Sequence, residues 1–209
     1  MSSPANNPTP IELVIASTNG HKVRELRIVL KTMTHLDILS LCDFPEYKPP
    51  EETGATFEEN AILKAEHAAK TLKRWVLADD SGLVVPALSG APGVLSARYA
   101  GNDATDLENR KKLLEDMKHL LEDDRRAFFE CCLVLASPMG VKKCVRGTCE
   151  GHLLTKDRGG SGFGYDPLFI KDSYSKTFAE LGESVKNRIS HRRKALDKIM
   201  FSLESLIRS

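Results

Sequence analysis

The sequence predicts an α/β fold built on a mixed β-sheet with flanking helices. Apolar runs followed by a turn and an amphipathic helix recur through the first half of the chain. In the second half, two apolar runs at 126–137 and 141–149 flank Pro138-Met139-Gly140 and predict a β-hairpin. Strand-turn-helix units together with a hairpin indicate a sheet with both parallel and antiparallel pairs.

The elements of the first half follow from their hydrophobic patterns. We expect a buried strand at 11–16, a turn at 17–20, a second short strand at 36–41 and a proline-containing loop at 43–54. The helix between the two strands has its apolar side chains on one face, at Val23, Leu26, Leu30 and Met33.

A second helix begins after Thr56, because Thr56 and Glu59 have the spacing of a capping box. It extends to about Leu72. Residues three and four apart are neighbours on a helix, which brings together the polar side chains of Asn60, Lys64 and His67. The strand that follows is expected to end in a turn at Asp79-Asp80-Ser81-Gly82, before another strand at 83–88.

The rest of the chain shows the same kind of signals. In order, we expect a loop at 90–101, a helix opened by a capping box at Thr105 and Glu108, the hairpin, a glycine-rich loop at 157–167, a short strand at 168–170, a helical turn at 178–181 and a closing helix capped by Ser190. The last helix has its inward positions at Leu196, Ile199, Leu203 and Leu206.

Length and composition indicate one ordinary globular domain. Of the 209 residues, 41% are apolar and 28% are charged, and the net charge of +1 gives no general field that favours nucleic acid or a membrane as partner. Residues 1–10 are expected to be a disordered tail and residues 11–209 a single domain. No stretch resembles a signal or a membrane span, and the five cysteines form no Cys-x-x-Cys pair, so we expect a cytoplasmic protein with reduced thiols.

Two adjacent carboxylates, Asp79 and Asp80, are the most informative local feature. They follow the apolar run Trp75-Val76-Leu77-Ala78, so we expect them at the carboxyl edge of the sheet, where α/β proteins bind ligands. Mg²⁺ is held in proteins by one or two carboxylates plus substrate phosphates. One of the two can therefore hold a metal ion while its neighbour supports the turn.

Three other segments carry ligand-binding chemistry. Ser17-Thr18-Asn19-Gly20-His21-Lys22 opens the first helix, where amides, hydroxyls and a lysine favour phosphate, although the P-loop pattern is missing. The glycines of 159–167 allow close approach to a ligand, and Phe163 offers a ring for a base; this loop leads into a strand, so it is not a dinucleotide fingerprint. Ser190-His191-Arg192-Arg193 places cations at a helix N-terminus, where they cost stability and so indicate function.

These segments and several others occur in an order typical of a known family. The motifs are Ser17-Thr18-Asn19-Gly20-His21-Lys22, Glu51-Glu52-Thr53-Gly54, Thr56 to Ala65, Ala78 to Leu83, Gly90-Ala91-Pro92-Gly93, Ser96 to Gly101, Phe163-Gly164-Tyr165-Asp166-Pro167 and Ile189-Ser190-His191-Arg192. Over residues 11 to about 207 the chain closely resembles the inosine triphosphate pyrophosphatase family in its bacterial form. The resemblance implies hydrolysis of XTP, ITP and dITP to the monophosphate and pyrophosphate, which cleanses the nucleotide pool. It also implies Mg²⁺ and a homodimer of elongated subunits, each with an active-site cleft between two lobes.

The resemblance further implies a role for each matching residue. Asp80 would be the catalytic proton acceptor, and Glu52 and Asp80 would hold the metal. The substrate contacts it implies are Ser17, Thr18, Asn19, Gly20, His21, Lys22, Asn60 and Lys64 for the phosphates, Ser81 beside them, and Phe163, Gly164, Tyr165, Asp166, Lys186, His191 and Arg192 for the nucleoside.

Some alternatives stay open at this point. Glu59 is a second candidate for the general base besides Asp80. Arg192, His191 and the amides of the Phe163 loop are expected to donate hydrogen bonds to the oxygen at C6 of the base. Two other functions compete: a pyrophosphatase of the Maf type, whose signature motifs are missing, and a nucleotide-binding module without activity, against which the intact metal carboxylates argue.

Overall fold

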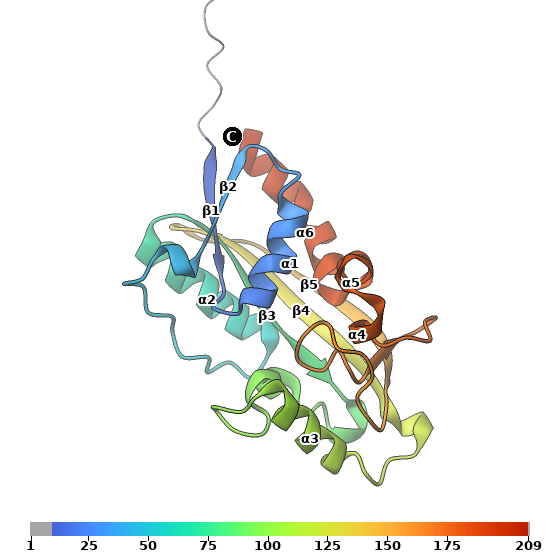
Figure 1. Cartoon of the computed structure of the whole chain (residues 1–209). Coiled ribbons are helices and arrows are strands. Elements are labelled where there is room, and N and C mark those ends of the chain that lie inside the picture. The colour runs from blue at the N-terminus through green and yellow to red at the C-terminus, as the bar shows by residue number, and fades with distance from the viewer. Residues whose placement is uncertain (1–9, 209) are drawn as a thin grey trace, which may run out of the picture.

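One mixed β-sheet organises the molecule, as Figure 1 shows. The structure is a computed structural model that describes residues 10–208. Within these residues the sheet has six strands in the order β2-β1-β3-β4-β5-β6. The strands are β1 Ile11–Ala16, β2 Leu36–Ser40, β3 Trp75–Val84, β4 Arg126–Ser137, β5 Gly140–Leu153 and β6 Phe169–Lys171.

The carboxylates of Asp79 and Asp80 lie where the sheet changes from parallel to antiparallel strand pairing. β1 pairs in parallel with both β2 and β3, while β3, β4, β5 and β6 pair in antiparallel fashion. The parallel register of β1 and β3 ends at Ala16 and Ala78. β3 continues beside β4, with Asp80 opposite Cys132. The turn predicted at 79–82 is therefore wrong, because β4 supplies a strand partner that the local sequence does not show. The two carboxylates lie within β3, just beyond the point where its pairing with β1 ends.

Helices cover both faces of the sheet (Figure 1). On one face, α1 and α6 share a core with β1 and β3 that includes Leu26, Leu203 and Leu77. On the other face, α2 packs through a row of small residues such as Ala65. The helices are α1 Gly20–Leu30, α2 Phe57–Leu72, α3 Asp106–Asp116, α4 Phe178–Leu181, α5 Glu183–Ile189 and α6 His191–Arg208.

A third core lies toward the far end of the long β4–β5 hairpin. It contains Leu113 of α3, Phe129 of β4 and Phe178 of α4, together with part of the loop that precedes β6. In Figure 1, α3 lies at the bottom of the molecule, away from the upper parts of α1 and α6. This separate cluster matches the predicted elongated fold with a second lobe.

The capping boxes begin their helices as predicted, with one difference. At α3 the Glu108 amide donates to Thr105 Oγ1 (3.3 Å) and the Thr105 amide donates to the Glu108 carboxylate (2.8 Å). At α2 the Glu59 amide donates to Thr56 Oγ1 (3.1 Å). The Glu59 carboxylate, however, accepts from the Ala55 amide (2.6 Å), so it holds the preceding loop.

Other expectations concern the cysteines, a short helix and the first residues. The five cysteines are free, and Cys131, Cys132 and Cys149 are buried. α5 was not predicted, because its seven residues carry too little periodicity to distinguish a helix from a loop. The tail expected at 1–10 lies outside the described residues, except for Pro10.

α6 approaches β5 closely at Gly147. A Cβ atom at this position would overlap the carbonyl oxygen of His191 and the backbone of Ala195. Only glycine leaves room for such a contact. The contact places the first turn of α6 directly against the sheet, where its side chains can form hydrogen bonds with residues of β3.

Candidate active site

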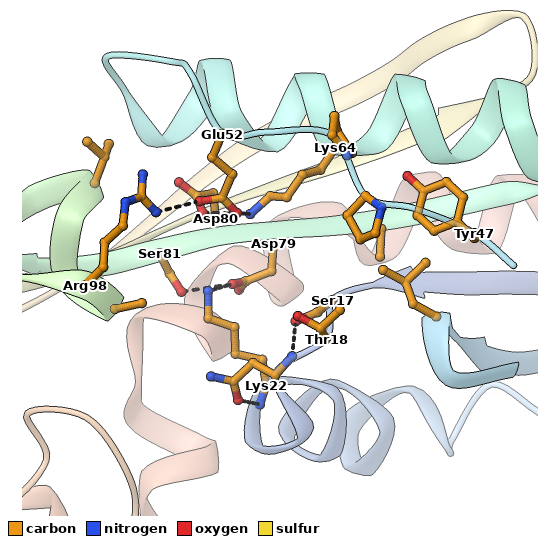
Figure 2. A pocket seen from close by; sticks show the side chains of 17 residues that line it. Ser17, Thr18, Lys22, Tyr47, Glu52, Lys64, Asp79, Asp80, Ser81 and Arg98 are labelled. Atoms are coloured by element: carbon orange, nitrogen blue, oxygen red, sulfur yellow. Dashed lines mark hydrogen bonds and ion pairs between the residues drawn. The ribbon is translucent and has the colours of Figure 1, made fainter. Parts of the chain in front are cut away.

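Two adjoining pockets lie where β1 ends and β3 continues. The larger encloses about 390 Å³ and the smaller about 90 Å³. They share Asn19, Lys22, Ser81 and Ala97 in their walls, so they form one continuous cleft. Figure 2 shows the larger pocket, with side chains reaching it from α1, α2, β3 and the loop before α2.

The walls of the larger pocket carry balanced charges. Among the described residues, the cations are Lys22, Lys64 and Arg98, and the carboxylates are Glu52, Asp79 and Asp80. Figure 2 shows Lys64 reaching from α2 toward Glu52 and Asp80, and Lys22 pointing up toward Asp79. Arg98 was not predicted as a site residue, but the 3₁₀ segment Gly93–Arg98 brings it into the pocket.

Asp79 is a buried anchor for cations. Lys22 Nζ lies 2.7 Å from one of its oxygens, and Arg192 Nε donates to the other at 2.8 Å. The Ser81 hydroxyl also donates to Asp79 (2.9 Å). Burial alone would raise the pKa of Asp79, but the charges of Arg192 and Lys22 outweigh it and hold that pKa well below the ordinary value. Asp79 is therefore ionised and fully engaged.

Asp80 has different surroundings, although it is the next residue. Its Oδ1 accepts from Lys64 Nζ at 2.7 Å. Its Oδ2 is buried and has no hydrogen-bond partner among the described residues. Burial raises the pKa of Asp80, and the opposing charges of Lys64 and Lys22 do not cancel the effect. A buried carboxylate oxygen without a partner is costly unless a cation or a donor completes it.

Glu52 shares its cation with Asp80. Lys64 Nζ lies 3.1 Å from Glu52 Oε1, and Arg98 Nη1 lies 3.4 Å from Oε2. One ammonium group thus stands within 3.1 Å of both carboxylates. It is a stand-in cation, and it shows that Glu52 and Asp80 can share a positive ion. In residues 10–208 no three His, Cys, Asp or Glu side chains gather into a metal site, and two carboxylates completed by phosphates are what Mg²⁺ uses.

α2 holds the loop that carries Glu52. Gly54 donates its amide to Asn60 Oδ1 (2.8 Å), and Asn60 is fully buried. Asn60 therefore lies behind the loop and lines neither of the two pockets. The Glu59 carboxylate holds the Ala55 amide of the same loop and is also away from both pockets. Asn60, which was predicted to contact phosphate, and Glu59, the alternative base, thus both hold the loop that carries Glu52.

The predicted phosphate segment is only partly open to a ligand. Ser17, Thr18, Asn19 and Lys22 line the larger pocket. The Asn19 side chain caps α1 and accepts from the amides of His21 (3.0 Å) and Lys22 (3.2 Å). Those two amides, expected to bind phosphate, are thus engaged within the helix start. Gly20 is the first residue of α1 and lines neither of the two pockets.

The smaller pocket gathers the residues predicted for the nucleoside. Its wall includes all seven of them: Phe163, Gly164, Tyr165, Asp166, Lys186, His191 and Arg192. The Phe163 ring stacks on His21 with centroids 5.0 Å apart and planes 11° apart, and Lys186 Nζ lies 4.3 Å from the centre of the same ring. Segments far apart in sequence therefore meet as the resemblance implied.

Arg192 is buried and forms ion pairs in the wall of the smaller pocket. Its Nε donates to Asp79, its Nη1 pairs with Glu25, and its Nη2 donates to Ser81 Oγ at 2.9 Å. The expectation that Arg192 donates to the base stays a prediction. Glu25 was not predicted as a site residue, because its position on α1 has the pattern of a solvent-facing charge. Only the fold brings Arg192 and Lys186 to it.

His191 is a buried, neutral ring. It stacks on Phe129 with centroids 4.8 Å and planes 13° apart. Burial, aided by the charges of Arg192 and Lys186, holds the pKa of His191 well below its ordinary value. Its Nδ1 is buried and has no hydrogen-bond partner among the described residues, and His191 lines the smaller pocket.

A family model described as the Ham1 family matches residues 13–201. The chain belongs to the Ham1 family. The resemblance found in the sequence is confirmed by relatives that carry pyrophosphatase names. A dITP/XTP pyrophosphatase of Protochlamydia amoebophila is 60% identical over 94% of this chain and 99% of its own length. A dITP/XTP pyrophosphatase of Chlamydia caviae is 54% identical over 94% of this chain and 96% of its own.

Solved structures of Ham1 proteins have the same fold. The Ham1 protein of Staphylococcus aureus superposes with a TM-score of 0.82 at 42% identity, covering 93% of this chain and 98% of that one. A HAM1 protein from Coxiella burnetii gives a TM-score of 0.84 at 41% identity, with 93% and 99% covered. The mixed sheet with flanking helices is therefore the fold of this family.

Proposed function

We propose that this protein hydrolyses noncanonical purine nucleoside triphosphates, namely XTP, ITP and dITP, to the monophosphate and pyrophosphate, and so cleanses the nucleotide pool. The observation that carries the proposal is the continuous cleft with two different ends. One end holds lysines, an arginine and carboxylates, and the other is lined by an aromatic ring and buried polar groups. A triphosphate with its nucleoside needs both. The names of the close relatives point to the same reaction.

The phosphate groups belong in the larger pocket. Lys22, Lys64 and Arg98 supply positive charge there, and the hydroxyls of Ser17 and Thr18 lie in the same wall. Fixed cations that face the charge developing on a leaving pyrophosphate stabilise the transition state. Lys22 and Ser81 also line the nucleoside pocket, so the α-phosphate belongs at this junction.

Glu52 and Asp80 are the residues that would hold Mg²⁺. The fit rests on the shared Lys64 ammonium and on the partnerless Asp80 Oδ2. When bound, Mg²⁺ would neutralise phosphate charge. Lys64, relieved of its role between the two carboxylates, would then be available to a phosphate.

Asp80 is the proposed general base. Its raised pKa and its partnerless Oδ2 suit a group that orients a water molecule and takes its proton. Asp79 is unsuited to this role, because two cations occupy it and depress its pKa. The water oxygen would form a bond to the α-phosphorus while its proton passes to Asp80. The bond from the α-phosphorus to the oxygen that bridges to the β-phosphorus would break, and pyrophosphate would leave.

A pyrophosphate-release assay tests the function. The protein is incubated with ITP, XTP, dITP, GTP and ATP, each with Mg²⁺ and with EDTA. We expect pyrophosphate from the first three only and only with Mg²⁺. Release from other nucleotides in place of these three would favour the Maf-type alternative, and nucleotide binding without release would favour a module without activity.

The oligomeric state and the location are part of the same proposal. A homodimer acting in the cytoplasm would agree with the resemblance of the sequence, and light scattering coupled to size exclusion would give the mass of the assembly. In residues 10–208 we find no helix with the length and apolar character needed to cross a membrane.

A further inference from the structure

The Phe163 loop is held from outside by α3. The loop is rich in glycine, and Gly164 has a left-handed backbone with φ of 59°. A segment of this kind has little conformation of its own and depends on its contacts. Phe163, next to Gly164, lines the nucleoside pocket, so the position of this loop determines the shape of that pocket.

Two side chains of α3 form hydrogen bonds with the backbone amide and the backbone carbonyl of Gly164. The Gly164 amide donates to Asp106 Oδ2 at 2.6 Å. Arg110 donates through Nη1 to the Gly164 carbonyl at 2.9 Å. Arg110 also donates through Nε to Asp157 Oδ2 at 2.9 Å, near the start of the same loop. Asp106 and Arg110 lie four residues apart on one face of α3, which is why both reach one residue.

α3 is itself tied to the segment that lines both pockets. Asn109, fully enclosed beside Arg110, donates to the Ala97 carbonyl (3.1 Å) and accepts from the Ala100 amide (2.8 Å). Ala97 lies in the walls of both pockets. α3 therefore joins the wall of the phosphate end to the loop at the nucleoside end.

We propose that Asp106 and Arg110 are positioning residues that fix the Phe163 loop and thereby set the affinity of the site for the nucleoside. The inference rests on the proposed function and adds residues to it, since no role had been assigned to either side chain. Neither belongs to the phosphate end, because Asp106 lines only the nucleoside pocket and Arg110 lines neither. The effect of losing them should therefore be confined to one end of the cleft.

Direct binding of two probe molecules tests the nucleoside end and the phosphate end of the cleft separately. IMP carries the base and one phosphate, and inorganic tripolyphosphate carries phosphates alone. Calorimetry with Mg²⁺ is done on Asp106→Ala and Arg110→Ala. We expect the Kd for IMP to rise about tenfold, as for the loss of one or two hydrogen bonds, and the Kd for tripolyphosphate to change less than twofold. A residue that only stabilised the fold would weaken both probes or neither.

Conservative variants keep the test decisive if an alanine variant folds poorly. Asp106→Asn retains an acceptor for the Gly164 amide, so the Kd for IMP should return to near the wild-type value. Arg110→Lys retains the charge but loses the guanidinium group that donates to two acceptors, so the Kd of this variant for IMP should stay raised. Lys111→Ala, an exposed change on the same helix, is the matched control.

A failure of this inference can be told apart from a failure of the proposed function. Absence of pyrophosphate release by the wild-type protein would reject the function, while the binding measurements would still report on the loop. Unchanged IMP binding in Asp106→Ala and Arg110→Ala, equal weakening of both probes, or Asp106→Asn behaving as Asp106→Ala would overturn the inference.

Discussion

Asp79 and Asp80 are neighbours in sequence whose surroundings drive their pKa values apart. Asp79 lies between two cations, and its pKa is depressed; Asp80 keeps one oxygen without a partner, and its pKa is raised. Successive residues of a strand point to opposite faces, so one carboxylate meets α1 and α6 and the other meets α2. Environment thus gives one residue an anchoring role and the other a chemical one.

Asp80→Asn should lower kcat for ITP by about 100-fold or more, as expected for the loss of a central catalytic group. The fold should persist, because asparagine keeps an oxygen for Lys64. Steady-state kinetics at saturating Mg²⁺, with urea denaturation as the control for folding, would measure both effects. Near-normal kcat in a folded variant would remove Asp80 from the mechanism.

Arg192→Ala should be strongly destabilising. The change removes a cation from both Glu25 and Asp79, which are buried. Removing one partner of a buried ion pair costs about 3–5 kcal/mol. Arg193→Ala is the matched control: Arg193 pairs with Asp197 on the helix surface, where an ion pair contributes about 0.5 kcal/mol or less. Urea denaturation of both variants measures the difference, and equal losses would contradict the buried network.

At the scale of elements, the strands and longer helices could be predicted from local patterns, but the partners of their polar residues could not. β1 is found at 11–16 and α4 at 178–181, as expected. Asp79-Asp80-Ser81-Gly82 looked like a turn because its stabilising contacts are distant: β4 pairs with it, and Arg192 lies 113 positions away in the chain. Asn60 had the spacing of a site residue, yet its amide is turned to the loop at Gly54.

Gly147→Ala should disturb the seat of α6 on β5. The new Cβ would overlap backbone atoms of His191 and Ala195, which cannot move without shifting the helix start. Such overpacking costs about 1–3 kcal/mol. Because His191 and Arg192 are carried by that turn, kcat/KM for ITP should fall as well.

Gly160→Ala is the steric control for this prediction, since a Cβ there meets nothing within 4 Å. Thermal denaturation and ITP kinetics are measured on both variants. Equal stability and activity in the two would mean that α6 does not depend on the close approach at Gly147.

At the scale of the whole molecule, one chain of ion pairs runs through the cleft. In order along the contacts, its members are Lys22, Asp79, Arg192, Glu25, Lys186 and Asp166. They come from α1, β3, α5, α6 and the loop before β6. Charges alternate along it, so each buried carboxylate is compensated, and the phosphate end and the nucleoside end share one network. No local pattern could reveal this chain, because its members meet only when the elements pack.

His191, packed beside this network, should make stability depend on pH. Its pKa is well below the ordinary value in the folded protein, while in the unfolded chain it is about 6.5. As pH falls through 6.5, the unfolded state therefore binds more protons at this position than the folded state, and stability falls. Between pH 6.5 and 5 the contribution of His191 to the free energy of unfolding should therefore decline.

His191→Gln isolates this contribution, because glutamine is polar and does not titrate. Urea denaturation of the wild type and the variant at a series of pH values from 7 to 5 gives two curves. The other titrating groups act on both, so the difference between the curves reports on His191 alone. We expect the wild-type curve to fall more steeply below pH 6.5 and the two to converge toward pH 5. Parallel curves would mean that the folded protein protonates His191 as easily as the unfolded chain does, and that the ring is less enclosed than its stacking on Phe129 indicates.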